Sequence, residues 1–197
     1  MADRRTPLAG LLPWALPDGA VALAEAPGLL QIGLRLKPQS DAVSGVRLPL
    51  APNRVEATRA VRSLWLGPDE WLITASQPAA PWLHSALTRA LVGRHAAVVD
   101  LSSNRVAIEI AGPQARALLE KGCSLDLHAR AFGPGQCAET LLAKTQIVLD
   151  QLDATPLYRV FVRASYARWL FDWLVDAAAE FAAPNMPDMR IAQADPR

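Results

Sequence analysis

The sequence has few of the side chains from which metal and redox sites are usually built. Two cysteines, Cys123 and Cys137, and three histidines occur among its 197 residues. Two cysteines are too few for a disulfide framework, and a chain of this length does not need one. Thirteen residues separate them, whereas zinc sites use closely spaced ligand pairs. We therefore predict small buried thiols, no metal site and a cytoplasmic protein.

An excess of charge of one sign is also missing. The chain has 20 Lys and Arg residues against 19 Asp and Glu, a net charge of +1, which gives no broad attraction to nucleic acid. No segment reaches the roughly 18 uninterrupted apolar residues of a membrane helix. An apolar stretch follows Arg4 and Arg5, but Pro7, Pro13 and Pro17 interrupt it, so we predict no export signal. Neither nucleic acid nor a membrane is expected as a partner.

The motifs of common active sites are absent as well. Gly112 is isolated, and Pro113 occupies a position where a phosphate-binding loop would offer an amide hydrogen, so neither a P-loop nor a dinucleotide fingerprint is present. Ser102 and Ser103 lie beside Asp100, but no histidine is near them in sequence. We therefore predict no catalytic residue, no metal ligand and no cofactor bound by this chain itself.

Hydrophobic periodicity predicts a mixed fold. The 51% hydrophobic content is ample for a packed core. Alternating patterns predict strands at about 28–37, 63–66, 71–74, 97–100, 106–110, 139–142, 147–152 and 158–163. Helical spacing predicts helices that begin near Pro81, Pro113 and Ser165, with Gly122 as a left-handed residue ending the second and Ser165 capping the third. We expect an α+β fold of antiparallel sheets flanked by helices.

The same pass along the chain predicts its domain organisation. Residues 1–28 are rich in Pro, Ala and Gly and are expected to form an irregular N-terminal arm. Residues 29–182 are predicted to form a single α+β domain, divisible into subdomains at about 29–96 and 97–182, with 38–59 as a long loop. Residues 183–197 are expected to form a C-terminal tail.

Tryptophan is unusually frequent, with six among twelve aromatic residues. Five of the six fall on predicted strands or helices, where we expect most of them to fill the core. Trp14 lies on the predicted arm, which has no core of its own to join. Since tryptophan is enriched at interface hot spots, we predict Trp14 to be an interface residue.

Three stretches carry a resemblance to a known family. They are residues 99–128, residues 137–144 followed by 158–173, and the segment 66–73 with the sequence Leu-Gly-Pro-Asp-Glu-Trp-Leu-Ile. These stretches resemble the gamma subunit of heterotetrameric sarcosine oxidase. The resemblance covers roughly residues 60–180, and the first sixty residues share only its general character.

The resemblance implies a place in a larger enzyme. Its partners would be an alpha subunit with NAD and folate sites, a beta subunit with FAD, and a zinc-binding delta subunit, with FMN shared between alpha and beta. That complex oxidises the methyl group of sarcosine, which gives glycine and hydrogen peroxide and passes the carbon to tetrahydrofolate. The chain itself is expected to be a non-catalytic structural subunit without a cofactor.

More distantly, the chain resembles the folate-binding domain of aminomethyltransferases. That resemblance aligns Asp126 with the acidic residue that handles the folate amine. The glycine-rich, Asn-containing hairpin of those enzymes corresponds to residues 142–146, which hold neither Gly nor Asn. A hairpin without glycine should lose its close backbone approach to a flat ligand. We therefore interpret Asp126 as a vestigial folate-pocket residue that now serves as a surface or capping carboxylate.

Two other functions stay open at this point. One is a stand-alone folate-dependent one-carbon transfer protein that uses Asp126. The other is the same domain reused in an oxidase of a different methylated amine, because substrate choice would reside in other chains.

Overall fold

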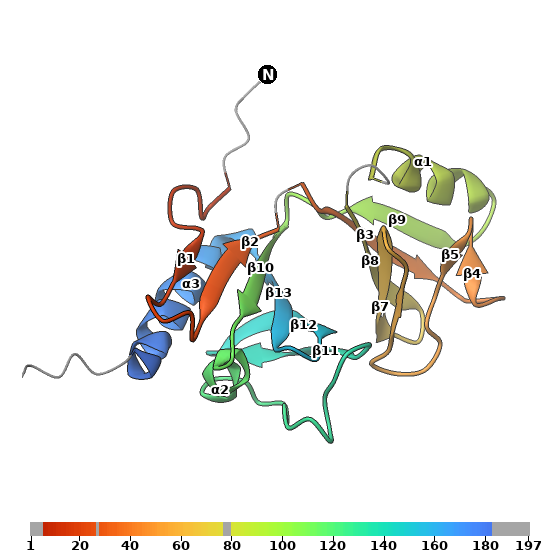
Figure 1. The fold of residues 1–197 in the computed structure, drawn as a ribbon. Coiled ribbons are helices and arrows are strands. Elements are labelled where there is room, and N and C mark those ends of the chain that lie inside the picture. Colours follow the sequence, from red (N-terminus) through yellow and green to blue (C-terminus); the bar gives the residue numbers. More distant parts are fainter. Residues whose placement is uncertain (1–5, 27, 77–79, 183–197) are drawn as a thin grey trace, which may run out of the picture.

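The computed structural model describes residues 6–26, 28–76 and 80–182. These ranges form two large antiparallel sheets, a small hairpin and three α-helices (Figure 1). The strands are β1 (Trp14–Ala15), β2 (Ala22–Glu25), β3 (Leu30–Leu36), β4 (Ala42–Val43), β5 (Val46–Arg47), β6 (Val55–Ala57), β7 (Val61–Gly67), β8 (Glu70–Ala75), β9 (Ala96–Asp100), β10 (Arg105–Ala111), β11 (Cys137–Leu142), β12 (Thr145–Asp153) and β13 (Leu157–Arg163). The helices are α1 (Ala80–Ala90), α2 (Ala115–Glu120) and α3 (Ala164–Ala178), followed by a 3-10 turn at Ala179–Phe181. The predicted α+β class with antiparallel sheets is confirmed.

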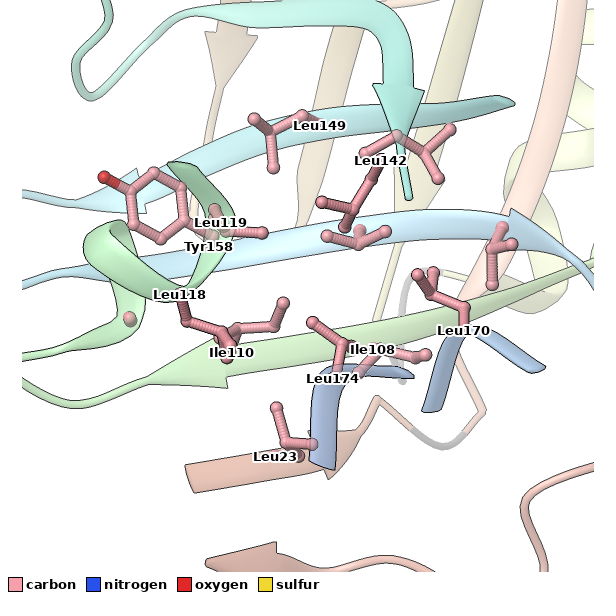
Figure 2. Close-up of a cluster of buried hydrophobic side chains, with 14 of the residues drawn as sticks. Leu23, Ile108, Ile110, Leu118, Leu119, Leu142, Leu149, Tyr158, Leu170 and Leu174 are labelled. Atoms are coloured by element: carbon pink, nitrogen blue, oxygen red, sulfur yellow. The ribbon is translucent and has the colours of Figure 1, made fainter. Parts of the chain in front are cut away.

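The first sheet is built mainly from the C-terminal half of the chain. Its strand order is β1-β2-β10-β13-β12-β11, with every neighbouring pair antiparallel. Alternate residues of β10, β12 and β13 point to the face that α2 and α3 cover, because successive side chains of a strand point to opposite faces. Figure 2 shows Leu170 and Leu174 of α3 directed toward Ile108 of β10 in this cluster, where each is fully buried.

The second sheet contains β6-β7-β8-β3-β9, again with antiparallel pairs. Helix α1 packs on its outer face through Leu83 and Leu87, and Leu91, directly after the helix, continues the same stripe. The β4–β5 hairpin contributes Val43 and Val46 to the same cluster. Residues 38–59, predicted as a loop, therefore contain three short strands that join this half of the structure.

The inner faces of the two sheets pack against each other. Leu64 and Leu72 of the second sheet join a buried cluster with Val148 and Phe161 of the first sheet. The helices thus lie on the outer faces, and the sheet–sheet contact forms the centre of the molecule (Figure 1). Polar side chains that enter this central layer must find partners there, because unpaired polar groups are costly to bury.

The N-terminal segment differs from the prediction of an irregular arm. Leu8, Leu16, Val21 and Leu23 are buried in the core of the first sheet, and β2 pairs with β10. The prediction of an irregular arm is therefore wrong for residues 8–25. Strands β1 and β2 are too short to show a periodic pattern in the sequence, and they are ordered by pairing with each other and with the distant strand β10. Residues 1–5 and the predicted tail at 183–197 lie outside the described residues.

The boundary between the two sheets also differs from the predicted subdomain division. Strand β9 pairs with β3 over the register from Ile32↔Asp100 to Leu36↔Ala96. It therefore belongs to the second sheet, and the chain passes to the first sheet only after Asp100. Strands β1 and β2 belong to the first sheet together with β10–β13, so the first sheet is built from two separate stretches of sequence, whereas the strands of the second sheet all lie between Leu30 and Asp100.

Two predicted helix ends are corrected by the structure. Helix α3 begins at Ala164 with Arg163 before it and no side-chain cap, so Ser165 lies inside the helix. Gly122, predicted to be left-handed, does not have a positive φ. Its role is spatial, because a Cβ at this position would lie 2.6 Å from the ring of Trp173 and 3.1 Å from the backbone nitrogen of Ala143.

Gly122→Ala should accordingly destabilise the protein. The added methyl group would force Trp173 or the hairpin to shift, and overpacking of this kind costs about 1–3 kcal/mol. Urea denaturation measures the change in the free energy of unfolding. Gly133→Ala is the matched control, since the nearest atom to a Cβ there is 3.7 Å away. Equal stability of the two variants would contradict the steric role of Gly122.

Candidate functional site

Asp126 lies on the surface, beyond the end of α2. Its side chain is 56% exposed, and its Oδ2 atom is 3.9 Å from the Arg130 guanidinium. Its Oδ1 atom accepts a hydrogen bond of 2.9 Å from the backbone nitrogen of His128. A carboxylate that bonds the amide two residues later closes an Asx turn. In this structure Asp126 is therefore a turn-forming surface carboxylate.

The hairpin that corresponds to the glycine-rich hairpin of aminomethyltransferases keeps an unusual backbone. Its two loop residues, Ala143 and Lys144, have φ of 49° and 65°. Positive φ at both positions is the type I′ geometry, which favours Asn-Gly because most side chains are strained there. The amide of Ala143 donates a 2.9 Å hydrogen bond to the carbonyl of Gly122. The tip of the hairpin is thus bonded to the segment that follows α2.

Lys144→Gly should therefore stabilise the chain, because glycine adopts positive φ without steric cost. The left-handed conformation costs other residues roughly 1–2 kcal/mol, and glycine loses part of that gain through the greater entropy of its unfolded state. We expect the free energy of unfolding to rise by about 0.5–1 kcal/mol in urea titrations. Gln146→Gly, within the extended strand β12, should lower it instead. A Lys144→Gly protein less stable than the parent chain would contradict this account of the turn.

Trp14 occupies strand β1 and is half-buried against the core of the first sheet. Trp14 was assigned to an interface because it was expected to lie on an arm without a core. That reason is wrong, since the segment packs on the core of the first sheet. Trp71 is fully buried, whereas Trp82 on α1 and Trp169 on α3 have exposed fractions of 50% and 47%. Tyr166, one turn before Trp169 on α3, is 52% exposed. The largest exposed aromatic surfaces thus lie on the outer helices.

The two cysteines are unpaired in the structure. Cys137 is fully buried between the sheets, and its Sγ atom lies 3.4 Å from the carbonyl oxygen of Trp65 and 3.5 Å from that of Arg54. Burial raises the pKa of the Cys137 thiol to about 12, so it stays protonated and unreactive at neutral pH. Cys123 is only partly buried, so the prediction of buried thiols holds for Cys137 alone. Among the described residues, no three His, Cys, Asp or Glu side chains gather closely enough to hold a metal ion.

The strongest polar interaction of the interior joins the two sheets. Arg62 of β7 and Asp150 of β12 form a bidentate pair, with Nε–Oδ2 at 2.8 Å and Nη2–Oδ1 at 2.7 Å. The Asp150 side chain has no exposed surface and that of Arg62 is 20% exposed. Burial raises the pKa of the Asp150 carboxyl, and the hydrogen bonds from Arg62 act in the opposite direction. This geometry suits an ionised carboxylate gripped by a guanidinium fork.

A second ion pair lies beside the first on the same face. Arg159 of β13 is directly opposite Asp150 in the strand register. Its Nη2 atom is 2.5 Å from Oε1 of Glu109 on β10, and its side chain is 13% exposed. The charges therefore alternate along a row of Glu109, Arg159, Asp150 and Arg62. The sequence holds one signal of this pair, the aspartate Asp150 at an inward-facing position of β12. It does not indicate which residue pairs with Asp150, because Arg62 lies 88 positions away.

Replacing one member of the Arg62–Asp150 pair should lower the free energy of unfolding more than replacing both members together. Arg62→Met or Asp150→Leu leaves one buried charge without its partner, which typically costs about 3–5 kcal/mol. The double variant should be more stable than either single variant, because no unpaired buried charge is left. Chemical denaturation of all three proteins tests this order.

Arg168→Met provides the control for this series. Arg168 forms an exposed pair with Asp172 on α3, and removing it should change stability by less than about 1 kcal/mol. Strictly additive losses for the Arg62 and Asp150 substitutions would contradict the coupling between the two sheets.

Ser102 and Asp100, which lie two positions apart in sequence, both bond to the backbone at the connection between β9 and β10. The Ser102 hydroxyl accepts a 2.9 Å hydrogen bond from the backbone of Gln31, and Asp100 accepts one from the Ser102 amide. These bonds fix the connection between the two sheets. Within the described ranges, the structure has no helix with the length and apolar character needed to span a bilayer.

Comparison with known proteins places this architecture in a family. A family model described as the sarcosine oxidase, gamma subunit family matches residues 39–180. The chain belongs to this family. It is 37% identical to sarcosine oxidase subunit gamma from Arthrobacter sp., over 93% of this chain and 94% of the relative. The corresponding subunit from Corynebacterium sp. strain U-96 is also 37% identical, with 86% and 84% coverage.

Solved structures support the family and its wider fold. A chain of heterotetrameric sarcosine oxidase from Corynebacterium sp. U-96, solved in complex with pyrrole 2-carboxylate, superposes with a TM-score of 0.84 at 36% identity. That match covers 93% of this chain and 99% of the other. Aminomethyltransferase T of the glycine cleavage system from Bartonella henselae gives a TM-score of 0.61 at 18% identity. The gamma family member spans 47% of that enzyme and shares its fold.

Proposed function

We propose that this chain is a structural subunit of a heterotetrameric sarcosine oxidase and carries no catalytic group of its own. The observation that carries the proposal is the match to a chain of such an oxidase over 99% of that chain. Because both chains have nearly the same extent, the same mode of assembly is the simplest inference. The complex would act in the cytoplasm.

The interior chemistry of the chain supports a structural role. The groups best placed for catalysis by burial, Asp150 and Cys137, are engaged in joining the two sheets. Asp126 closes a surface turn. On this proposal FAD, FMN, NAD, tetrahydrofolate and zinc belong to the alpha, beta and delta subunits, where sarcosine is converted to glycine and hydrogen peroxide. The gamma chain contributes surface to that assembly.

Helix α3 offers the most suitable docking surface. Tyr166 and Trp169 are one turn apart and therefore lie on one side of the helix. Each has about half of its surface exposed, while Leu170 and Leu174, on the adjacent side of the helix, are fully buried in the core. Large aromatic side chains on a rigid support are typical anchors of protein interfaces. We propose that a partner subunit covers this aromatic pair.

Co-expression with the other three subunits tests the assembly. Size-exclusion chromatography should recover the chain in the oxidase complex, and Trp169→Ala should weaken its association about tenfold or more without lowering its melting temperature. Glu120→Ala, an exposed polar position at the end of α2, is the control and should leave association unchanged. A chain that elutes alone while the other subunits form an active oxidase would overturn the proposal.

A separate titration distinguishes the structural role from folate chemistry. The isolated chain should show no micromolar affinity for tetrahydrofolate, because Asp126 is held in a turn and the hairpin tip is bonded to Gly122. Micromolar binding that Asp126→Asn abolishes would instead identify a folate-dependent one-carbon transfer protein.

A further inference from the structure

A pocket of about 250 Å³ opens beside the central ion pairs. It lies where the turn before β7 meets the ends of β8, β12 and β13, at the margin of the sheet–sheet contact. Three arginines line it, namely Arg59, Arg62 and Arg159, while Leu29 and Leu152 supply apolar wall. No acidic residue is among the described residues of its lining. The pocket is therefore a cationic concavity.

Two of the three guanidinium groups are fixed in place. Arg62 uses Nε and Nη2 to bind Asp150, and Arg159 uses Nε and Nη2 to bind Glu109. A guanidinium has five N–H donors, so in each case the Nη1 donors remain for another acceptor. Neither Nη1 atom has a hydrogen-bond partner among the described residues, and neither is a buried atom without a partner, so each keeps contact with solvent. Asp150 and Glu109 thus hold the guanidinium groups of Arg62 and Arg159 in place and leave their Nη1 donors free to bind another acceptor.

Arg59 adds the third charge from the rim. It lies on the turn between β6 and β7, which is held by hydrogen bonds from the amides of Ala60 and Val61 to the Thr58 hydroxyl. The amide of Ser76 bonds the carbonyl of Ala60 and ties this turn to the end of β8. Arg59 makes no ion pair with any described residue, so its charge is uncompensated at the pocket mouth.

We propose that this pocket binds a small oxyanion, a carboxylate or a phosphate on a compact molecule. Guanidinium groups that are preoriented and partly buried bind such anions through charge-assisted hydrogen bonds. The volume lies just below the roughly 300–1,000 Å³ of pockets for drug-sized ligands, which suits a small organic acid or phosphate. This inference does not depend on the proposed role in an oxidase.

Equilibrium dialysis of the full chain against radiolabelled inorganic phosphate and against radiolabelled acetate tests the site. Both measurements are made at constant ionic strength, because screening weakens non-specific binding to surface charges. We expect saturable binding of one equivalent of at least one anion. The anion that binds more tightly then assigns the ligand to the phosphate or the carboxylate class.

Arg59→Gln should weaken that binding about tenfold, the order expected for one charge-assisted contact. Since Arg59 is exposed, the variant should keep the melting temperature of the parent chain. Arg89→Gln on α1 carries the same change of charge away from the pocket and should bind normally. Absence of saturable binding for both anions, or equal weakening in the two variants, would overturn the proposal.

Discussion

The bidentate contact between Arg62 and Asp150 is the interaction on which the centre of the molecule depends. The two sheets meet through a small apolar cluster, and the aspartate lies at its edge without any exposed surface. A buried carboxylate is tolerable only with a well-aligned partner. The pair therefore fixes the position of one sheet relative to the other. If either sheet slid, the guanidinium nitrogens of Arg62 would move away from the carboxylate oxygens of Asp150. Apolar side chains alone would constrain that geometry less, because dispersion contacts are not directional.

Local pattern predicted most of the regular elements, and it failed where order comes from distant partners. Strands β10 and β13 alternate clearly over their full length, so their existence could be inferred from the sequence alone. Strands β1 and β2 are too short to show a period, and they are ordered by pairing with each other and with β10. The premise behind the predicted interface role of Trp14, a segment without a core, fails for the same reason, since that core is supplied by residues far along the chain.

The candidate site shows the same division between local and non-local information. The position of Asp126 followed from the family resemblance, and its turn involves only neighbouring residues. The row of Glu109, Arg159, Asp150 and Arg62 comes from four strands of two sheets, and no pattern within any one strand identifies its partners. The absence of glycine from the hairpin did not reveal its backbone conformation, since Ala143 and Lys144 have positive φ, which the strand pairing on either side of the turn dictates.

The pairing of β2 with β10 also has a consequence for synthesis of the chain on the ribosome. Leu23 pairs with Ile110, so the N-terminal strand emerges long before the strand that completes it. At about 5–20 residues per second, the intervening segment takes roughly 4–17 s to translate. During that interval Leu8, Leu16, Val21 and Leu23 have no sheet to cover them. These apolar side chains therefore lack their native cover until translation has passed the middle of the chain.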